Sequence, residues 1–305
     1  MPSAPDHKST FESLSLPVFC ILGAISLAIW WSPLFSTFAL ALHDDQYTHI
    51  LLILPVSAAL IFMDWKPFEA HSRLSLLTGS VLLVAAAWSA FFMRWRAVSL
   101  PTDEQLSANM LALVVWWIAA FILCFGLPAS RRALFPLCFL LWLVPLPNFV
   151  LNPIVNLLQQ GSAAAAHLLF AAAGVPVEQR GVLVHIPGLI VEVARECSSI
   201  RSSSMLIVTT MVLAQLLLRS AWRKAFIILV AIPLSVAKNG LRIFTIAMLT
   251  THVDPSFLTG RLHRKGGIIF FMIALAATFL LLWILRRGEE ANDGVRATGA
   301  VSTEI

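Results

Sequence analysis

A series of long apolar runs along nearly the whole chain limits what this protein can fold into. Each run holds roughly 18 to 25 residues, enough for a helix to cross a hydrocarbon core of about 30 Å. Hydrophobic residues make up 59% of the 305 residues and charged residues 12%, too apolar a balance for a soluble domain of this length. The runs are apolar on every side, unlike the alternating strands of a β-barrel. The sequence therefore predicts an all-α polytopic membrane protein.

The apolar runs predict about eight transmembrane helices. Their spans lie near 16–42, 48–63, 74–93, 108–127, 132–149, 198–218, 225–249 and 266–285. We expect one transmembrane domain over 16–287, between two short, polar and disordered cytoplasmic tails at 1–15 and 288–305.

Short basic joints between the runs predict the topology. They carry no acidic residue and consist of Arg131, Arg132, Arg219, Arg223, Lys224, Arg286 and Arg287. The positive-inside rule assigns them to the cytoplasm, together with both termini, although Arg94 and Arg96 depart from it. We expect a multi-pass protein of the cytoplasmic membrane. Its net charge of +5 comes from helix ends, so membrane lipids are the expected surroundings and nucleic acid is not an expected partner.

The region between the fifth and sixth spans is more polar. Segment 152–173 carries four amides, and because amides facing lipid are costly, it is predicted as an amphipathic helix at the outer interface. The alternative is a ninth span, which would put the basic joints on opposite sides of the membrane. "RGVLVHIPGLIVEVAREC" (180–197) follows, with a Pro187-Gly188 turn between two β-rich runs. It predicts a small extracytoplasmic β-hairpin that leads to Cys197.

Cys197 differs from the other cysteines in its surroundings. Cys20, Cys124 and Cys138 lie inside apolar runs at no metal-like spacing, as small buried residues do. Cys197 lies among charges, with Glu196 before it and Arg201 one turn later at the start of a helix. The helix dipole and a neighbouring cation both lower the pKa of a thiol there. The pattern indicates a candidate nucleophile and calls for no metal or cofactor.

Two further polar groups are predicted at the same depth as Cys197. Measured from the basic joints at 1.5 Å per residue, Cys197 lies about 33 Å along its helix, Arg242 about 27 Å and His263 about 35 Å. Lys238 and Asn239 share a helix face with Arg242, and so polar a stripe more often faces a protein cavity than lipid. Three helices would thus bring a thiol, a guanidinium and an imidazole to the outer boundary.

These three groups are the parts needed for acyl transfer: a nucleophile, a general base and acid, and a fixed charge for the oxyanion. The sequence lacks the His-Glu-x-x-His and Gly-x-Ser-x-Gly signatures, and no carboxylate lies deep in a span. Ser202, Ser203 and Ser204 suggest a serine intramembrane protease but have no evident general base in the sequence.

The ordered motifs resemble the exosortase/archaeosortase family of membrane transpeptidases. "ECSSIRSSS" opens one span, "NGLRI" lies near the outer end of the next, and a histidine precedes the last, at family-like spacing. "HDDQYTHILLILP" (43–55), with Asp45, Tyr47 and His49, is similar to the loop and second span of exosortases. Archaeosortases tend to carry arginine at the position of His263, so the resemblance is to exosortases.

The resemblance implies roles and a substrate class. It makes Cys197 the nucleophile, Arg242 the transition-state or orienting cation and His263 the partner base. Supporting or substrate-binding roles are expected for Glu196, Arg201, Lys238, Asn239 and Arg261. The implied partners are secreted proteins with a C-terminal sorting signal, made of a Pro-Glu-Pro-like motif, a transmembrane helix and a basic tail. Cleavage through a thioester would occur at the outer face of the cytoplasmic membrane.

Two other classes stay open from the residues alone. An anion transporter or channel could line its cavity with Lys238, Asn239 and Arg242. An enzyme of lipid-linked glycans could hold a pyrophosphate with the same cations. Both predict that Cys197 can be replaced freely. The substrate's identity, hydrolysis versus transfer to an acceptor, and the oligomeric state also stay open.

Overall fold

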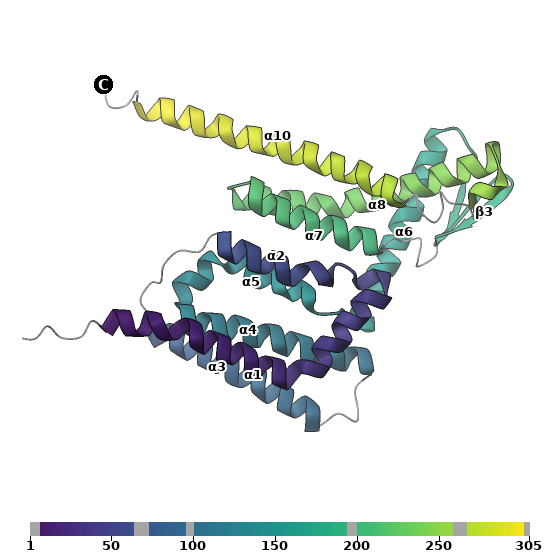
Figure 1. Ribbon diagram of the computed structural model, residues 1–305. Coiled ribbons are helices and arrows are strands. Elements are labelled where there is room, and N and C mark those ends of the chain that lie inside the picture. Colours follow the sequence, from purple (N-terminus) through teal and green to yellow (C-terminus); the bar gives the residue numbers. More distant parts are fainter. Residues whose placement is uncertain (1–6, 64–72, 96–100, 194–199, 259–266, 302–305) are drawn as a thin grey trace, which may run out of the picture. The chain divides into compact units, whose positions relative to one another are not determined.

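The structure is a computed structural model (Figure 1) that describes residues 7–63, 73–95, 101–193, 200–258 and 267–301. The chain divides into two compact units, Met1–Leu151 and Asn152–Ile305. Each unit has its own set of packed helices, and they are described in turn.

Among the described residues, seven helical segments are long and apolar enough to cross a membrane. They are Ser15–His43, Asp45–Met63, Leu74–Met93, Thr102–Arg132, Ile200–Leu217, Ala221–His252 and Gly267–Ala291. Leu134–Leu143 and Asn148–Ala172 meet the same criterion only as a pair with a break between them, which gives up to eight spans. The all-α polytopic membrane fold is thereby confirmed.

The first unit is built around α4 (Thr102–Arg132), which packs against α1 (His7–His43) and α3 (Arg73–Trp95). Indole N–H groups join α4 to α1: Trp116 donates to the Leu22 carbonyl at 3.0 Å and Trp117 to Ser26 Oγ at 2.9 Å. After η1 (Asp45–Tyr47), α2 (Ile50–Met63) packs on α5 (Leu134–Phe139). Ser57 there donates to the Pro136 carbonyl at 3.1 Å. Trp116, Trp117 and Ser57 thus find hydrogen-bond acceptors inside the helix layer, where lipid could supply none.

The predicted span 132–149 is not one continuous helix. α4 continues past a break at Gly126, whose φ of 83° favours glycine, and ends at Arg132. Only α5 and the 3-10 helix η2 (Leu140–Leu143) follow before the chain leaves helical structure. Pro145 and Pro147 lie in this non-helical stretch, and proline supplies no backbone N–H to continue a helix. Ten residues at 1.5 Å each reach about 15 Å, too short to cross a bilayer alone.

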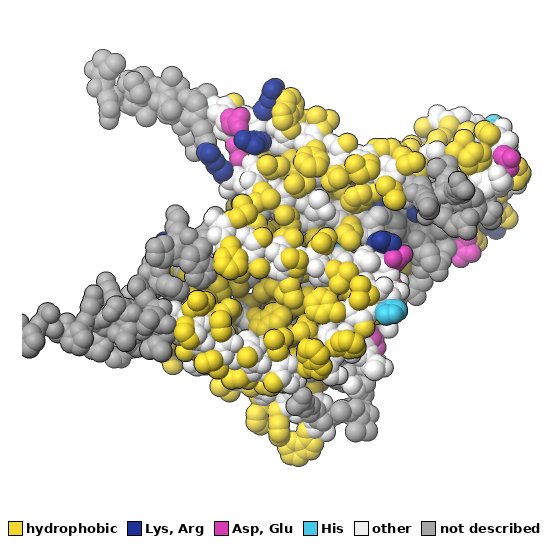
Figure 2. All heavy atoms as spheres, in the orientation of Figure 1, with side chains coloured by type: hydrophobic (Ala, Val, Ile, Leu, Met, Phe, Trp, Pro, Cys, Tyr) yellow, Lys and Arg dark blue, Asp and Glu magenta, His cyan; other side chains and the backbone are white. Residues whose placement is uncertain are grey.

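The second unit has three long helices that pack against one another: α7 (Ile200–Leu217), α8 (Ala221–His252) and α10 (Gly267–Val301). They run side by side, and α7 and α10 begin at the same end (Figure 1). Their outer sides carry exposed large hydrophobic residues such as Leu229, Ile269 and Trp283. Figure 2 shows hydrophobic side chains spread across the coloured part of the visible surface. In a membrane protein such a surface faces lipid.

A small sheet and α6 (Asn148–Ala172) cover the end of α8. The sheet is antiparallel in the order β1-β2-β3, with β1 (Glu178–Arg180), β2 (Leu183–Ile186) and β3 (Leu189–Glu192). The predicted hairpin is β2–β3, and β1 is an additional strand. The buried core between sheet and helices consists of Ala163, Ala166, Phe170, Val184, Ile186, Val193, Ile243 and Ala247. On α6, Asn156 and Gln160 are exposed and Gln159 is buried, and the apolar Leu157 and Leu168 are exposed as well.

Helices extend into both segments that were predicted as tails. α1 begins at His7, and α10 continues to Val301. An ion pair one turn apart supports the extension of α10, because Arg286 Nε lies 3.1 Å from Glu290 Oε1. Glu289 accepts the backbone N–H groups of Arg219 and Ser220 at 3.0 and 2.8 Å. The polar end of α10 thus has partners that composition alone does not reveal.

Gly240 sets the distance between α6 and α8. A Cβ at this position would lie 2.5 Å from Ala165 Cβ and 3.0 Å from the backbone of Ala165 and Ala166. Gly240→Ala is therefore expected to push the helices apart and to lower the free energy of unfolding by about 1–3 kcal/mol. Thermal unfolding in detergent measures this change. Gly23→Ala is the matched control, because a Cβ on that helical glycine meets nothing within 4 Å. Equal stability of the two variants would contradict the close approach.

Candidate functional site

The first turn of α7 is fastened to the middle of α8 by two side-chain hydrogen bonds. Lys238 Nζ donates to Ser202 Oγ, and Ser235 Oγ donates to Ser203 Oγ at 2.5 Å. Lys238 follows Ser235 by about one turn, so both bonds leave the same side of α8. The start of α7, immediately after the segment that contains Cys197, is thereby held beside Lys238.

The polar stripe of α8 faces protein, as predicted. The side chain of Lys238 is 6% exposed and that of Asn239 is 1% exposed. Arg242, one turn beyond Lys238, is half-buried. A basic side chain inside a span would reach toward the interface if it faced lipid, whereas these groups lie within the helix packing.

Arg242 also lies at the start of α10. Its Nη1 atom is 3.9 Å from the position that a Cβ would take at Gly267, the first residue of α10. This separation is an ordinary van der Waals distance, so the guanidinium lies against the first residue of α10. The structure therefore brings together the first turn of α7, the Lys238–Arg242 turn of α8 and the first turn of α10.

Hydrogen bonds fix the chain just before the segment that contains Cys197. The N–H of Val193 donates to the Val182 carbonyl at 3.0 Å, which extends the β2–β3 ladder by one residue. Gln159 Nε2 of α6 donates to the Val193 carbonyl at 2.6 Å, and both residues are buried. The sheet is thus anchored to α6 at the point where the chain continues toward α7.

The chain after α8 is fixed by a local turn. The N–H of Ser256 donates to Asp254 Oδ1 at 2.7 Å at the start of η3 (Pro255–Leu258), which packs against α8. This bond, together with one from the Ser256 hydroxyl, holds the pKa of the Asp254 carboxyl below its ordinary value. The turn precedes the segment that leads to α10.

Several predicted site residues lie outside the described residues. Glu196 and Cys197 belong to 194–199, and Arg261 and His263 belong to 259–266. Of the others, Arg201 lies in the first turn of α7 with an exposed side chain. Lys238, Asn239 and Arg242 gather as described above. The described part of the candidate site therefore consists of Lys238, Asn239 and Arg242 on α8 and the first turns of α7 and α10.

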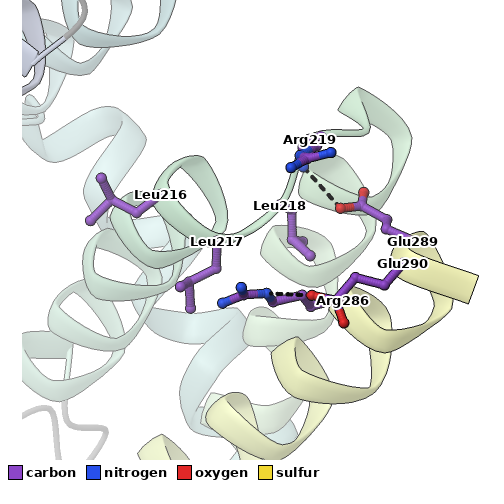
Figure 3. Close-up of a pocket in the computed structure, with 7 residues that line it drawn as sticks. All are labelled: Leu216, Leu217, Leu218, Arg219, Arg286, Glu289 and Glu290. Atoms are coloured by element: carbon purple, nitrogen blue, oxygen red, sulfur yellow. Dashed lines mark hydrogen bonds and ion pairs between the residues drawn. The ribbon is translucent and has the colours of Figure 1, made fainter. Parts of the chain in front are cut away.

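A pocket of about 190 Å³ lies at the other end of α7. Its lining consists of Leu216, Leu217, Leu218, Arg219, Arg286, Glu289 and Glu290 (Figure 3). There Glu289 binds the α7–α8 joint, while Arg223 donates to the carbonyls of Leu285 and Gly288 at 2.6 and 3.1 Å. Because Glu289 already binds backbone N–H groups and Arg286 pairs with Glu290, we interpret this pocket as part of the packing between helix ends. It also places two of the predicted cytoplasmic basic joints side by side.

A family model for transmembrane exosortases matches residues 30–280 of the chain. The match contains the whole described site and most of both units. This chain belongs to the transmembrane exosortase family. Comparison with curated proteins and with solved structures gives no match. Membership of the exosortase family supports a membrane transpeptidase or protease in general, and it favours this class over the transporter and the lipid-linked glycan enzyme.

The contacts of two residues in this candidate site were not predicted from the sequence. Ser202 is the partner of Lys238, and Gln159 is the anchor of Val193. The run Ser202 to Ser204 is visible in the sequence. Which α8 residue it contacts depends on helix rotation and register, which a single sequence does not give. The amide of Gln159 was predicted to face the interface, and it is instead satisfied inside the protein.

The Lys238–Ser202 bond is expected to contribute to stability. A hydrogen bond to a charged group contributes about 1.5–3 kcal/mol, so Ser202→Ala and Lys238→Met should show a coupling of that size. A double-mutant cycle on thermal or denaturant unfolding measures it. Ser204→Ala, two residues further along α7, is the matched control and should show little coupling to Lys238→Met. Additive effects of Ser202→Ala and Lys238→Met would contradict the contact.

Proposed function

We propose that this exosortase family member is a cysteine transpeptidase or protease that cleaves the C-terminal sorting signal of exported proteins through a thioester. The observation that carries the proposal is the position of the Arg242 guanidinium at the start of α10, one turn from the lysine that binds the start of α7. Cys197 precedes Ile200 by three residues, and His263 precedes Gly267 by four. Chain connectivity alone keeps both within about 15 Å of those helix starts.

The three groups divide the reaction between them. The proton of the Cys197 thiol passes to the His263 imidazole, and the thiolate attacks the carbonyl carbon of the scissile peptide bond. Arg242 stabilises the negative charge that develops on the carbonyl oxygen. The C–N bond then breaks, the leaving amine takes the proton from the imidazolium, and a thioester to Cys197 remains.

The second half of the reaction mirrors the first. Water or an acceptor amine gives a proton to His263 and attacks the thioester, which releases the product and restores the thiol. Lys238 and Asn239 lie about one turn from Arg242 on α8. Arg201 lies in the first turn of α7, and Arg261 precedes α10 in the sequence. These cations suit a substrate motif that carries a carboxylate, and Glu196 is suited to orienting one of them. The basic joints of the chain support a site on the outer face of the cytoplasmic membrane.

A second candidate function is favoured by one contact. Lys238 Nζ bonds Ser202 Oγ, and a lysine beside a serine is a known alternative to the histidine–serine pair in hydrolases. In that case Ser202 would be the nucleophile and Lys238 its base. The two candidates differ in which residue, Cys197 or Ser202, the reaction cannot do without.

Expression of the full chain with a tagged substrate tests the proposed function. The substrate is an exported reporter that ends in a Pro-Glu-Pro-like motif, a transmembrane helix, a basic tail and a C-terminal tag. We expect the chain to convert it to a shorter form without the tag, as seen by blot. The matched control is the same reporter with the motif replaced by glycine and serine, which should stay intact. A motif-bearing reporter that keeps its full length in the presence of the expressed chain would contradict the proposal.

A further inference from the structure

β3 is an edge strand of the outer sheet. It pairs with β2 on one side, in the register Val184 to Val191 and Ile186 to Leu189. The bond from Val193 to Val182 fixes which residues exchange hydrogen bonds, because bonded and non-bonded pairs alternate in an antiparallel ladder. Leu189, Val191 and Val193 therefore turn their backbone groups toward β2. Ile190 and Glu192 turn theirs away from it, toward the open edge.

The open edge of β3 differs from the opposite edge of the same sheet. On β1, Glu178 and Arg180 form an exposed ion pair at 2.8 Å, and charged side chains of this kind protect an edge from strand addition. On β3, Ile190 is 62% exposed between two other apolar residues, and Glu192 at the end of the strand is its one charged residue. Within the part of the chain that the structure describes, no hydrogen bond reaches the backbone of Ile190 or Glu192. β3 thus has the features of an edge that accepts another strand.

The place of β3 in the chain indicates what that strand is. Glu192, its last residue, precedes Cys197 by five residues, and the end of β3 is fixed by Gln159. Chain connectivity keeps a peptide carbonyl bound at Cys197 within about 20 Å of the end of this strand. We propose that the extended segment of the substrate just before its transmembrane helix adds to β3 as a fourth strand, bonded to the backbone of Ile190 and Glu192. This inference rests on the proposed function.

The direction of the added strand follows from the two chains. After β3 this protein continues into α7, and after its motif the substrate continues into its own transmembrane helix. If both helices enter the membrane from the same face, the added strand runs parallel to β3. A Pro-x-Pro motif suits this position. The residue between the prolines turns its N–H and C=O toward β3. The two prolines, which have no N–H, face the other edge of the added strand, where no N–H is needed.

Proline substitution tests the strand addition. In Ile190→Pro the lost N–H is the one at the open edge, so the β2–β3 ladder keeps its bonds, and the ring blocks the approach of another strand. Processing of the tagged substrate is expected to fall about five- to tenfold, in keeping with the loss of one backbone hydrogen bond and the steric block. Gln179→Pro is the matched control. Gln179 lies on β1 opposite Val184 of β2, and its N–H points to the other edge of the sheet. Processing by this variant should stay unchanged. Equal processing by both variants, at equal thermal stability, would overturn the inference.

Photo-cross-linking separates this inference from the proposed function. A benzoyl-phenylalanine at position 190 or 192, in chains that also carry Cys197→Ala, is expected to cross-link the bound substrate, and one at 179 is not. The parallel direction expects the cross-link from 190 to lie nearer the substrate's N-terminus than the one from 192. No cross-link from either position, or the reverse order, would overturn the inference while the processing assay with Cys197 intact still reports on the proposed function.

Discussion

Replacement of Cys197 by alanine is expected to abolish processing of a sorting-signal substrate, with a loss of at least about 10³-fold. Without the thiol no thioester forms, and Arg242 and His263 have no nucleophile to assist. The measurement is the rate at which a tagged substrate loses its C-terminal tag in cells. Cys197→Ser should also be strongly impaired, because a serine hydroxyl is far less acidic than a thiol and needs a stronger base.

Two comparisons make the cysteine prediction specific. Cys138→Ala removes an exposed cysteine that has no part in the proposed site, so its processing should equal that of the parent chain. Ser202→Ala separates the two candidate nucleophiles. An inactive Ser202→Ala chain beside an active Cys197→Ala chain would contradict the thioester mechanism and would favour the serine–lysine alternative.

Replacement of Arg242 is expected to give the second largest loss. Arg242→Gln removes the charge that faces the oxyanion, and a fall of about 10²- to 10³-fold in the processing rate is the usual effect of such a loss. Arg242→Lys keeps a charge but not the planar pair of donors, so it should recover only part of the activity. Both rates are measured per amount of folded protein, with the same tagged substrate.

Arg223 provides the matched control for Arg242. It lies on the same helix at the opposite end and donates to the carbonyls of Leu285 and Gly288. Arg223→Gln should lower the free energy of unfolding by about 2 kcal/mol while the rate per folded protein stays the same. If Arg242→Gln behaves in the same way, lowering stability alone, then Arg242 serves the packing of α8 and α10 and not the reaction.

The spans were predictable because a lipid environment restricts the backbone conformations that a chain can adopt. Every backbone group must bond within its own helix, so a long apolar run becomes a helix almost regardless of its neighbours. The errors fall where local chemistry interrupts that rule. Pro145 and Pro147 break the run at 132–149, and Gly126 redirects α4 without ending it. β1 has the sequence Glu-Gln-Arg, which has little strand propensity, and it is a strand because β2 lies beside it.

The sequence indicated which helix end carries Arg242, but not the contacts that Arg242 and its neighbours make. Counting residues from the basic joints placed Arg242 near the outer ends of the neighbouring helices, and the structure puts its guanidinium beside Gly267 at the start of α10. Counting does not give helix rotation, so the pairing of Lys238 with Ser202 could not be read from the sequence. The anchor from Gln159 to Val193 joins residues 34 positions apart through the fold of the sheet, which local patterns do not encode.

The central claim is that one pocket holds Cys197 together with His263 and Arg242, and thiol cross-linking tests it most directly. In a chain with Cys20, Cys124 and Cys138 replaced by alanine, His263→Cys or Arg242→Cys adds one partner for the native Cys197. A short bifunctional thiol reagent is expected to join Cys197 to either partner in the folded protein. Trp283→Cys, sixteen residues after the start of α10, should not be joined. A link from Cys197 to position 283, or none to positions 242 and 263 in folded protein, would contradict the account.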